Sequence, residues 1–63
     1  MGGLKIIGYI IEGSTDHLIV DFNTNTVYRK NDDGDHIWEE TFPNSRQLRD
    51  WLEGHRKAGL IYG

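Results

Sequence analysis

The chain has 63 residues, of which 37% are hydrophobic and 27% are charged, and it contains no cysteine. This composition predicts one small globular domain over residues 1–63, and it excludes disulfides and thiolate metal sites. The net charge of −3 is uneven: residues 1–42 carry three basic and eight acidic side chains, whereas residues 43–63 carry four and two. The acidic part is unsuited to binding a phosphate backbone.

Four segments in the first two thirds of the chain have the pattern of β-strands. The predicted strands are Leu4–Glu12, His17–Phe22, Thr26–Lys30 and His36–Phe42. The first is rich in isoleucine, and the second alternates apolar with polar residues at the period of a half-buried strand. Short turns rich in asparagine, aspartate and glycine separate the segments, and such turns favour hairpins. We therefore predict an antiparallel meander.

The period changes after Pro43. Asn44 can cap a helix, and Gln47 stands three residues later, where a capping box needs it. The helix is predicted to end at Gly59, with Gly54 as an alternative end because glycine weakens a helix interior. Its apolar face carries Leu48, Trp51, Leu52 and His55.

These elements predict an α+β fold: a four-stranded antiparallel β-meander followed by one C-terminal α-helix packed on one face. The helix and the alternating strands together define a candidate core. The predicted core residues are Leu18, Val20, Phe22, Trp38, Phe42, Leu48, Trp51 and Leu52.

One helix covers only one face of a sheet, yet the first strand is apolar on both faces. The predicted second face carries a set of large apolar side chains that we assign to partner binding. These residues are Ile7, Tyr9, Ile11, Ile19 and Ile37. An apolar second face indicates contact with another protein or a second copy of the chain, unless the tail Leu60–Tyr62 covers it.

No pattern of residues predicts catalysis, a metal site or a cofactor. Asn31, Asp33 and Asp35 have the spacing that opens a calcium loop, but residues His36 and Phe42 stand where that loop needs glycine and glutamate. His17 and His36 begin two different strands and His55 lies on the helix, so a zinc site is not expected. No nucleophile is spaced beside a base, and no glycine-rich phosphate loop is present. We expect a protein that is not an enzyme and has no small-molecule substrate.

Nucleic-acid binding is the alternative function. Aromatic and basic side chains together can stack on bases and contact phosphates, and two segments offer such groups. They are Tyr28, Arg29 and Lys30 on the third strand and Arg46, Arg49, Arg56 and Lys57 on the helix.

The sequence thus predicts a small non-catalytic protein–protein interaction module: a regulator, adaptor or inhibitor that could self-associate through the uncovered sheet face. A short, acidic chain without cysteine or motifs is typical of an accessory protein of a bacterium or phage. A domain this small without disulfides is expected in the cytoplasm. No membrane contact is expected, because the apolar run Ile6–Ile11 is too short to span a bilayer.

Overall fold

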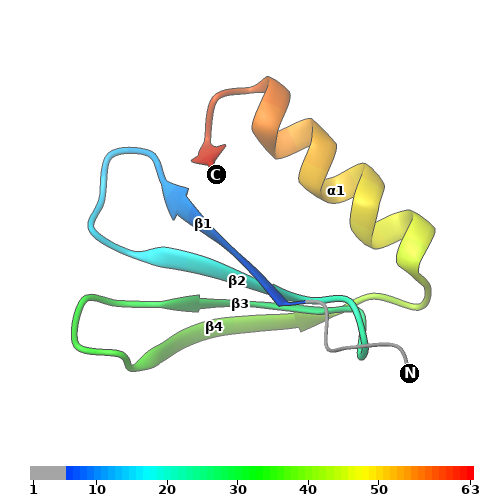
Figure 1. The fold of residues 1–63 in the computed structure, drawn as a ribbon, viewed down its shortest axis with the longest axis horizontal. Helices are drawn as coiled ribbons and strands as arrows, with labels where there is room; N and C mark the ends of the chain where they lie inside the picture. The colour runs from blue at the N-terminus through cyan, green and yellow to red at the C-terminus, as the bar shows by residue number, and fades with distance from the viewer. Residues whose placement is uncertain (1–5) are drawn as a thin grey trace.

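The computed structural model describes residues 6–63. Its elements follow each other with short connections and form a sheet with one helix above it (Figure 1). They are β1 (Ile6–Ile11), β2 (His17–Asp21), β3 (Thr26–Lys30), β4 (His36–Thr41), α1 (Ser45–Lys57) and β5 (Ile61–Tyr62). The part of the first predicted strand before Ile6 lies outside the described residues.

The sheet has the strand order β4-β3-β2-β1-β5, with every neighbouring pair antiparallel. The predicted α+β fold, a four-stranded meander with one C-terminal helix, is therefore confirmed. The turns have the backbone that their residues favour: Asn25 and Gly34 both have positive φ, at 54° and 88°.

The C-terminal tail extends the sheet and does not fold across its second face. Ile61 pairs with Ile11 and is buried on the helix side, whereas Tyr62 pairs with Ile10. Gly59 permits this reversal after the helix because its φ of 74° is open to glycine at little cost. The tail thus adds a fifth, two-residue strand that the sequence did not predict.

Helix α1 begins where the sequence predicts. The Asn44 side chain accepts a hydrogen bond from the Gln47 backbone N–H at 2.9 Å, which satisfies one of the free donors of the first turn. The helix continues through Gly54 to Lys57, and the Ala58 and Gly59 N–H groups donate to carbonyls of the last turn. The basic side chains of that turn also suit the negative end of the helix dipole.

Replacing Asn44 by alanine is expected to lower the free energy of unfolding by about 1 kcal/mol, because the Gln47 N–H loses its acceptor. Urea unfolding followed by circular dichroism measures the change. Asn44→Asp is the control and should retain most of the stability, because its carboxylate also accepts this bond. If the alanine variant were as stable as the wild type and the aspartate variant, the Asn44 side chain would contribute nothing to stability.

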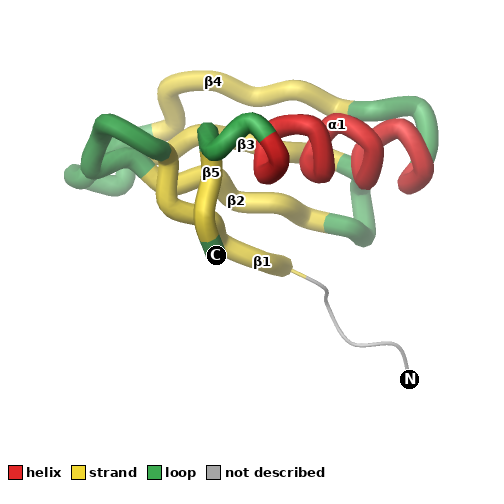
Figure 2. Tube along the Cα trace, turned by 90° about the horizontal axis from the view of Figure 1, so that it is seen from above, coloured by secondary structure: helices red, strands yellow, loops and turns green. Residues whose placement is uncertain are grey.

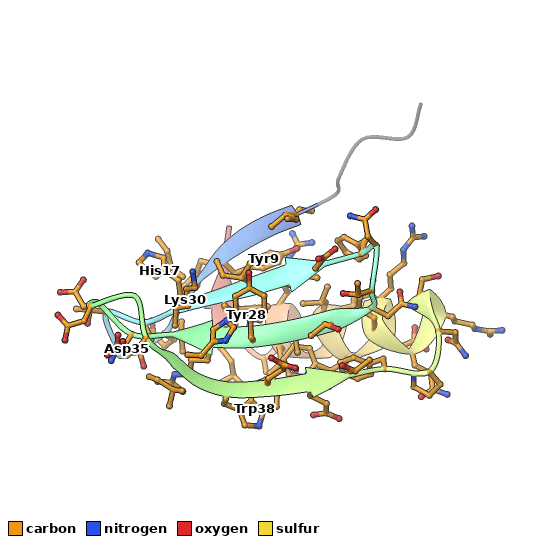
Figure 3. The ribbon with its side chains drawn as sticks, turned by 90° about the horizontal axis from the view of Figure 1, so that it is seen from below. Tyr9, His17, Tyr28, Lys30, Asp35 and Trp38 are labelled. Atoms are coloured by element: carbon orange, nitrogen blue, oxygen red, sulfur yellow. The ribbon has the colours of Figure 1, made fainter. Side chains whose placement is uncertain are left out.

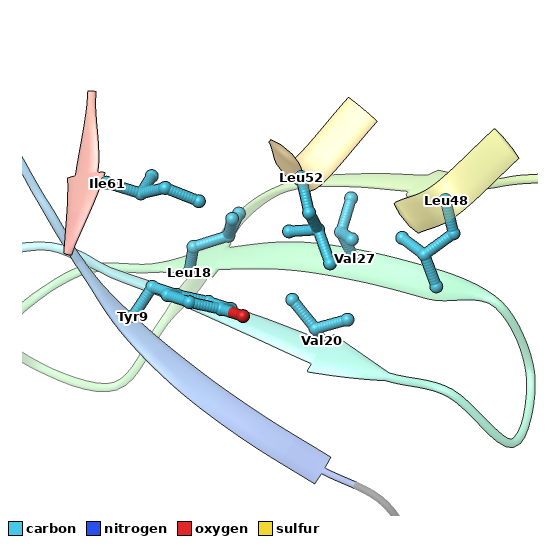
Figure 4. Packing of buried hydrophobic residues seen from close by; sticks show 7 residues of the cluster. All are labelled: Tyr9, Leu18, Val20, Val27, Leu48, Leu52 and Ile61. Atoms are coloured by element: carbon cyan, nitrogen blue, oxygen red, sulfur yellow. The ribbon is translucent and has the colours of Figure 1, made fainter. Parts of the chain in front are cut away.

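The core lies between α1 and the sheet (Figure 4). Its buried members come from four strands and the helix, which ties all layers to one cluster. They are Tyr9, Leu18, Val20, Val27, Leu48, Leu52 and Ile61. Four were predicted; of the other predicted members, Phe22, Phe42 and Trp51 pack against the cluster half-buried. Trp38 is the exception, since 41% of its surface stays exposed.

The predicted assignment of β1 to the two faces is wrong. The register pairs Tyr9 with Leu18 and Ile7 with Val20, so Ile7, Tyr9 and Ile11 lie on the helix side. Tyr9 is a core residue. The side chains on the two faces of β1 are both apolar, so the sequence of β1 alone does not determine which face meets the helix.

The predicted place of Ile37 is also wrong. Strict alternation sets it opposite Trp38, but the β3–β4 register shifts between Arg29 and Lys30. A bulge of this kind re-aims the side chains beside it. Ile37 and Trp38 consequently line the same hollow on the helix side.

Candidate functional site

Helix α1 does not cover the whole upper face of the sheet. Seen from above, it runs over the middle of the sheet and leaves β4 uncovered along one side (Figure 2). Every residue of β4 is exposed. A groove lined by residues of both β4 and α1, among them Ile37, Trp38, Trp51 and His55, lies between the helix and this edge strand.

The groove has a volume of about 600 Å³ and a mostly apolar lining. Its apolar walls come from β1, β2, the β4 bulge, the helix and the tail. The apolar lining residues are Ile11, Leu18, Ile37, Trp38, Trp51, Leu60 and Ile61. Three of them are about half exposed, with exposures of 54% for Ile37, 41% for Trp38 and 49% for Leu60.

A row of aromatic rings forms one wall. The Trp38 and Trp51 rings are stacked, with 6.1 Å between centroids and 19° between planes. Trp51 also lies against His55, at 3.9 Å, and against Phe42, at 5.7 Å. Rigid aromatic surface beside solvent is the surface that protein interfaces use most as an anchor.

Glu12, Asp16, Arg29 and His55 are the polar residues that line the groove, and the last three are engaged in hydrogen bonds within the domain. Arg29 donates from Nε to Asp16 Oδ2 at 2.7 Å, and its Nη2 lies 2.7 Å from the same oxygen. His55 donates from Nδ1 to the Trp51 carbonyl oxygen at 2.8 Å. These contacts hold the Arg29, Asp16 and His55 side chains in place without directing them at a common point.

The opposite face of the sheet has a different character. Figure 3 shows this open face, from which His17, Tyr28 and Lys30 project. Tyr28 contacts the His36 ring edge-on at 4.2 Å, and Lys30 Nζ lies 5.8 Å from the Tyr28 ring centre. This half of the face is mixed and polar.

The other half of the open face is apolar. Ile10 is 55% exposed, Ile6 and Tyr62 are about as exposed, and Ile19 beside them is half-buried. A hydrogen bond to the Glu12 carboxylate, together with its negative charge, raises the pKa of Tyr62. We call Ile6, Ile10, Ile19 and Tyr62 the open-face patch.

The five predicted partner-binding residues are spread over four places. Ile11 and Ile37 line the groove, and Ile19 lies in the open-face patch. Tyr9 is buried in the core, and Ile7 lies on the helix side at the outer edge of the sheet. Their role in partner binding stays a prediction, with the groove as the place where two of them meet.

The predicted nucleic-acid residues lie on opposite sides of the molecule. Tyr28 and Lys30 point to the open face, while Arg29 points to the helix side and is paired with Asp16. The helix residues Arg49 and Arg56 lie together on the side of α1 that faces Tyr9 and Phe22. Arg46 falls on that side by helical spacing, and Lys57 lies 3.6 Å from Glu53. The strand and helix groups do not form one surface.

The sequence predicts Trp38 and Trp51 as core residues and Leu60 as part of a tail that could cover the second sheet face. A signal was present in the helix pattern, because Trp51 and His55 extend the apolar stripe beyond Leu48 and Leu52. The sheet buries Leu48 and Leu52 but leaves Trp51 and His55 only half-buried.

Residues 6–63 bring no group of three or more potential ligands together for a metal ion. No helix in this range is long and apolar enough to cross a membrane. Comparison with protein-family models, curated proteins and solved structures finds no match.

Proposed function

We propose that this chain is a non-catalytic protein-binding module and that the groove between α1 and β4 is its contact surface. The observation that carries the proposal is the group of exposed apolar side chains around a hollow of about 600 Å³. Large apolar side chains that gather at one exposed place mark interaction sites on soluble proteins.

The composition of the groove supports a protein partner. Tryptophan is among the residues that contribute most to interfaces, and here the exposed Trp38 is supported from behind by Trp51. The ion pair of Arg29 with Asp16 satisfies two of the three charged groups that line the groove, the third being Glu12, so a partner covers this pair at a smaller desolvation cost.

The groove is preferred to the open-face patch because it is concave and aromatic, whereas the patch is aliphatic apart from Tyr62. A concave apolar surface holds an inserted side chain on several sides and excludes water around it. Self-association through the open-face patch remains the competing form of the same function.

Nucleic-acid binding is the second candidate, favoured by the placing of Arg49 and Arg56 on one side of the helix. Glu53 lines the same hollow and lowers its positive charge. Binding there would depend on phosphate contacts and would weaken steeply with salt.

A matched pair of substitutions separates these proposals. Ile37 in the groove and Ile10 on the open face are 54% and 55% exposed, and both lie on strands. We expect Ile37→Lys to capture at least tenfold less protein than the wild-type chain does, because a lysine replaces an apolar contact at the interface. Ile10→Lys should retain it. The measurement is affinity capture from lysate at high salt after nuclease treatment, with quantitative mass spectrometry.

Each other outcome has a defined meaning. Loss with Ile10→Lys alone would move the contact to the open-face patch. Loss of all bound material after nuclease or salt, together with weakening by Arg49→Ala, would favour nucleic acid on the helix. If both lysine variants captured as much protein as the wild-type chain, neither apolar surface would be the contact surface.

A further inference from the structure

The free edge of β4 lies directly beside the groove. β4 is the last strand at one end of the sheet, so one row of its backbone groups has no neighbouring strand within residues 6–63. The Phe42 N–H donates to the Asn25 carbonyl at 2.8 Å, which fixes the direction of the alternating backbone groups. Residues two apart point the same way, so Glu40 and Trp38 bond toward β3. The N–H and C=O groups of Glu39 and Thr41 consequently face outward.

The same edge is strongly acidic. Residues 31–44 contain five carboxylates and no lysine or arginine. Two of the carboxylates, Glu39 and Glu40, lie on β4, and the other three lie at the turn before it. This local charge attracts a basic segment and repels an acidic one.

A second copy of the chain is a poor occupant of this edge. An antiparallel pair of β4 strands centred on Glu39 or on Glu40 would set that carboxylate opposite its own copy, which destabilises a strand pair. Charge complementarity instead favours a different chain whose residues facing β4 are basic and apolar.

We propose that the groove binds an extended basic and apolar peptide segment, which joins the sheet as an antiparallel strand at the edge of β4. The inference rests on the proposed function and deepens it by naming the class of partner. Strand addition supplies main-chain hydrogen bonds, and alternate side chains enter the groove and give specificity.

The register assigns a chemistry to each peptide position. The peptide residue opposite Glu39 exchanges two backbone hydrogen bonds with it, and its side chain lies on the open face. The residues opposite Glu40 and Trp38 turn their side chains to the helix side. A basic residue suits the positions opposite Glu39 and Glu40, and a β-branched apolar residue opposite Trp38 enters the groove.

An acetylated, fluorescent nonapeptide provides the probe. Its sequence is two threonines, two lysines, valine, threonine, valine and two threonines, so that the lysines lie opposite Glu40 and Glu39 and the first valine lies opposite Trp38. Fluorescence anisotropy with the wild-type protein is expected to give a Kd below about 1 mM, weakening with salt.

Two methylated peptides test the strand geometry without changing the protein. Nα-methylation of the second lysine blocks an N–H that faces β4 and should weaken binding at least tenfold. The same change at the first lysine, whose N–H faces solvent, should weaken it less than threefold. Replacing both lysines by glutamates should abolish binding, and Ile37→Lys should weaken it at least tenfold.

Equal effects of the two methylations would overturn strand addition, as would an unmethylated probe that does not bind. Either result leaves the proposed function to be judged by the Ile37→Lys and Ile10→Lys capture experiment, which requires no strand pairing. A stable dimer in sedimentation analysis that does not bind the probe, and that persists when Ile10→Lys is introduced on the open face, would show that a second copy occupies the edge.

Discussion

Replacing Leu48 by alanine is expected to lower the free energy of unfolding by about 3–5 kcal/mol, the cost of removing a fully buried leucine. Leu48 has no exposed surface and belongs to the cluster that joins α1 to the sheet. A chain of 63 residues has a total stability of roughly 3–9 kcal/mol, so this single cavity is comparable to the whole. We expect Leu48→Ala to be partly or fully unfolded at room temperature.

Arg49→Ala is the control because it changes the next residue of the same helix, which is exposed. Its effect should stay within about 0.5 kcal/mol, as for most surface substitutions. Urea unfolding followed by circular dichroism gives the value for Arg49→Ala, and for Leu48→Ala the circular dichroism signal without urea gives the fraction that stays folded. A loss below about 1 kcal/mol for Leu48→Ala would mean that the helix contributes little to the fold and that the groove has no rigid wall.

The strands and the helix could be predicted because local patterns determine them. The alternation in β2, the Asp33-Gly34 turn and the Asn44 cap all appear in the structure where the sequence places them. Each of these signals depends on residues close together in the chain, and the tertiary structure agrees with them.

The candidate site depends on features that local patterns do not contain. Ile37 reaches the groove through a bulge, and a bulge adds one residue without leaving a sequence signature here. Which face of β1 meets the helix is decided by pairing with β2, because both faces of β1 are apolar. Leu60 reaches the groove because Gly59 turns the chain back toward β1.

Trp51→Ala is expected to have the second-largest effect on stability, a loss of about 2–3 kcal/mol. Replacing a fully buried tryptophan by alanine lowers the free energy of unfolding by about 3–5 kcal/mol. Trp51 is only half-buried, so the expected loss is smaller. Its ring contacts three others, those of Trp38, His55 and Phe42, so its removal leaves one wall of the groove without support. Trp38→Ala should cost only about 1 kcal/mol, because Trp38 lies on the edge strand and is 41% exposed.

The two substitutions should therefore separate stability from binding. Trp38→Ala should weaken the nonapeptide at least tenfold while the domain stays folded, since Trp38 offers the exposed surface of the wall. A double-mutant cycle on the two tryptophans, followed by circular dichroism in urea, should give a coupling of about 0.5–1.5 kcal/mol for stacked rings. Zero coupling would show that the rings do not support each other. If Trp38→Ala also left peptide binding unchanged, the aromatic wall would not be the recognition surface, and the open-face patch would become the better candidate.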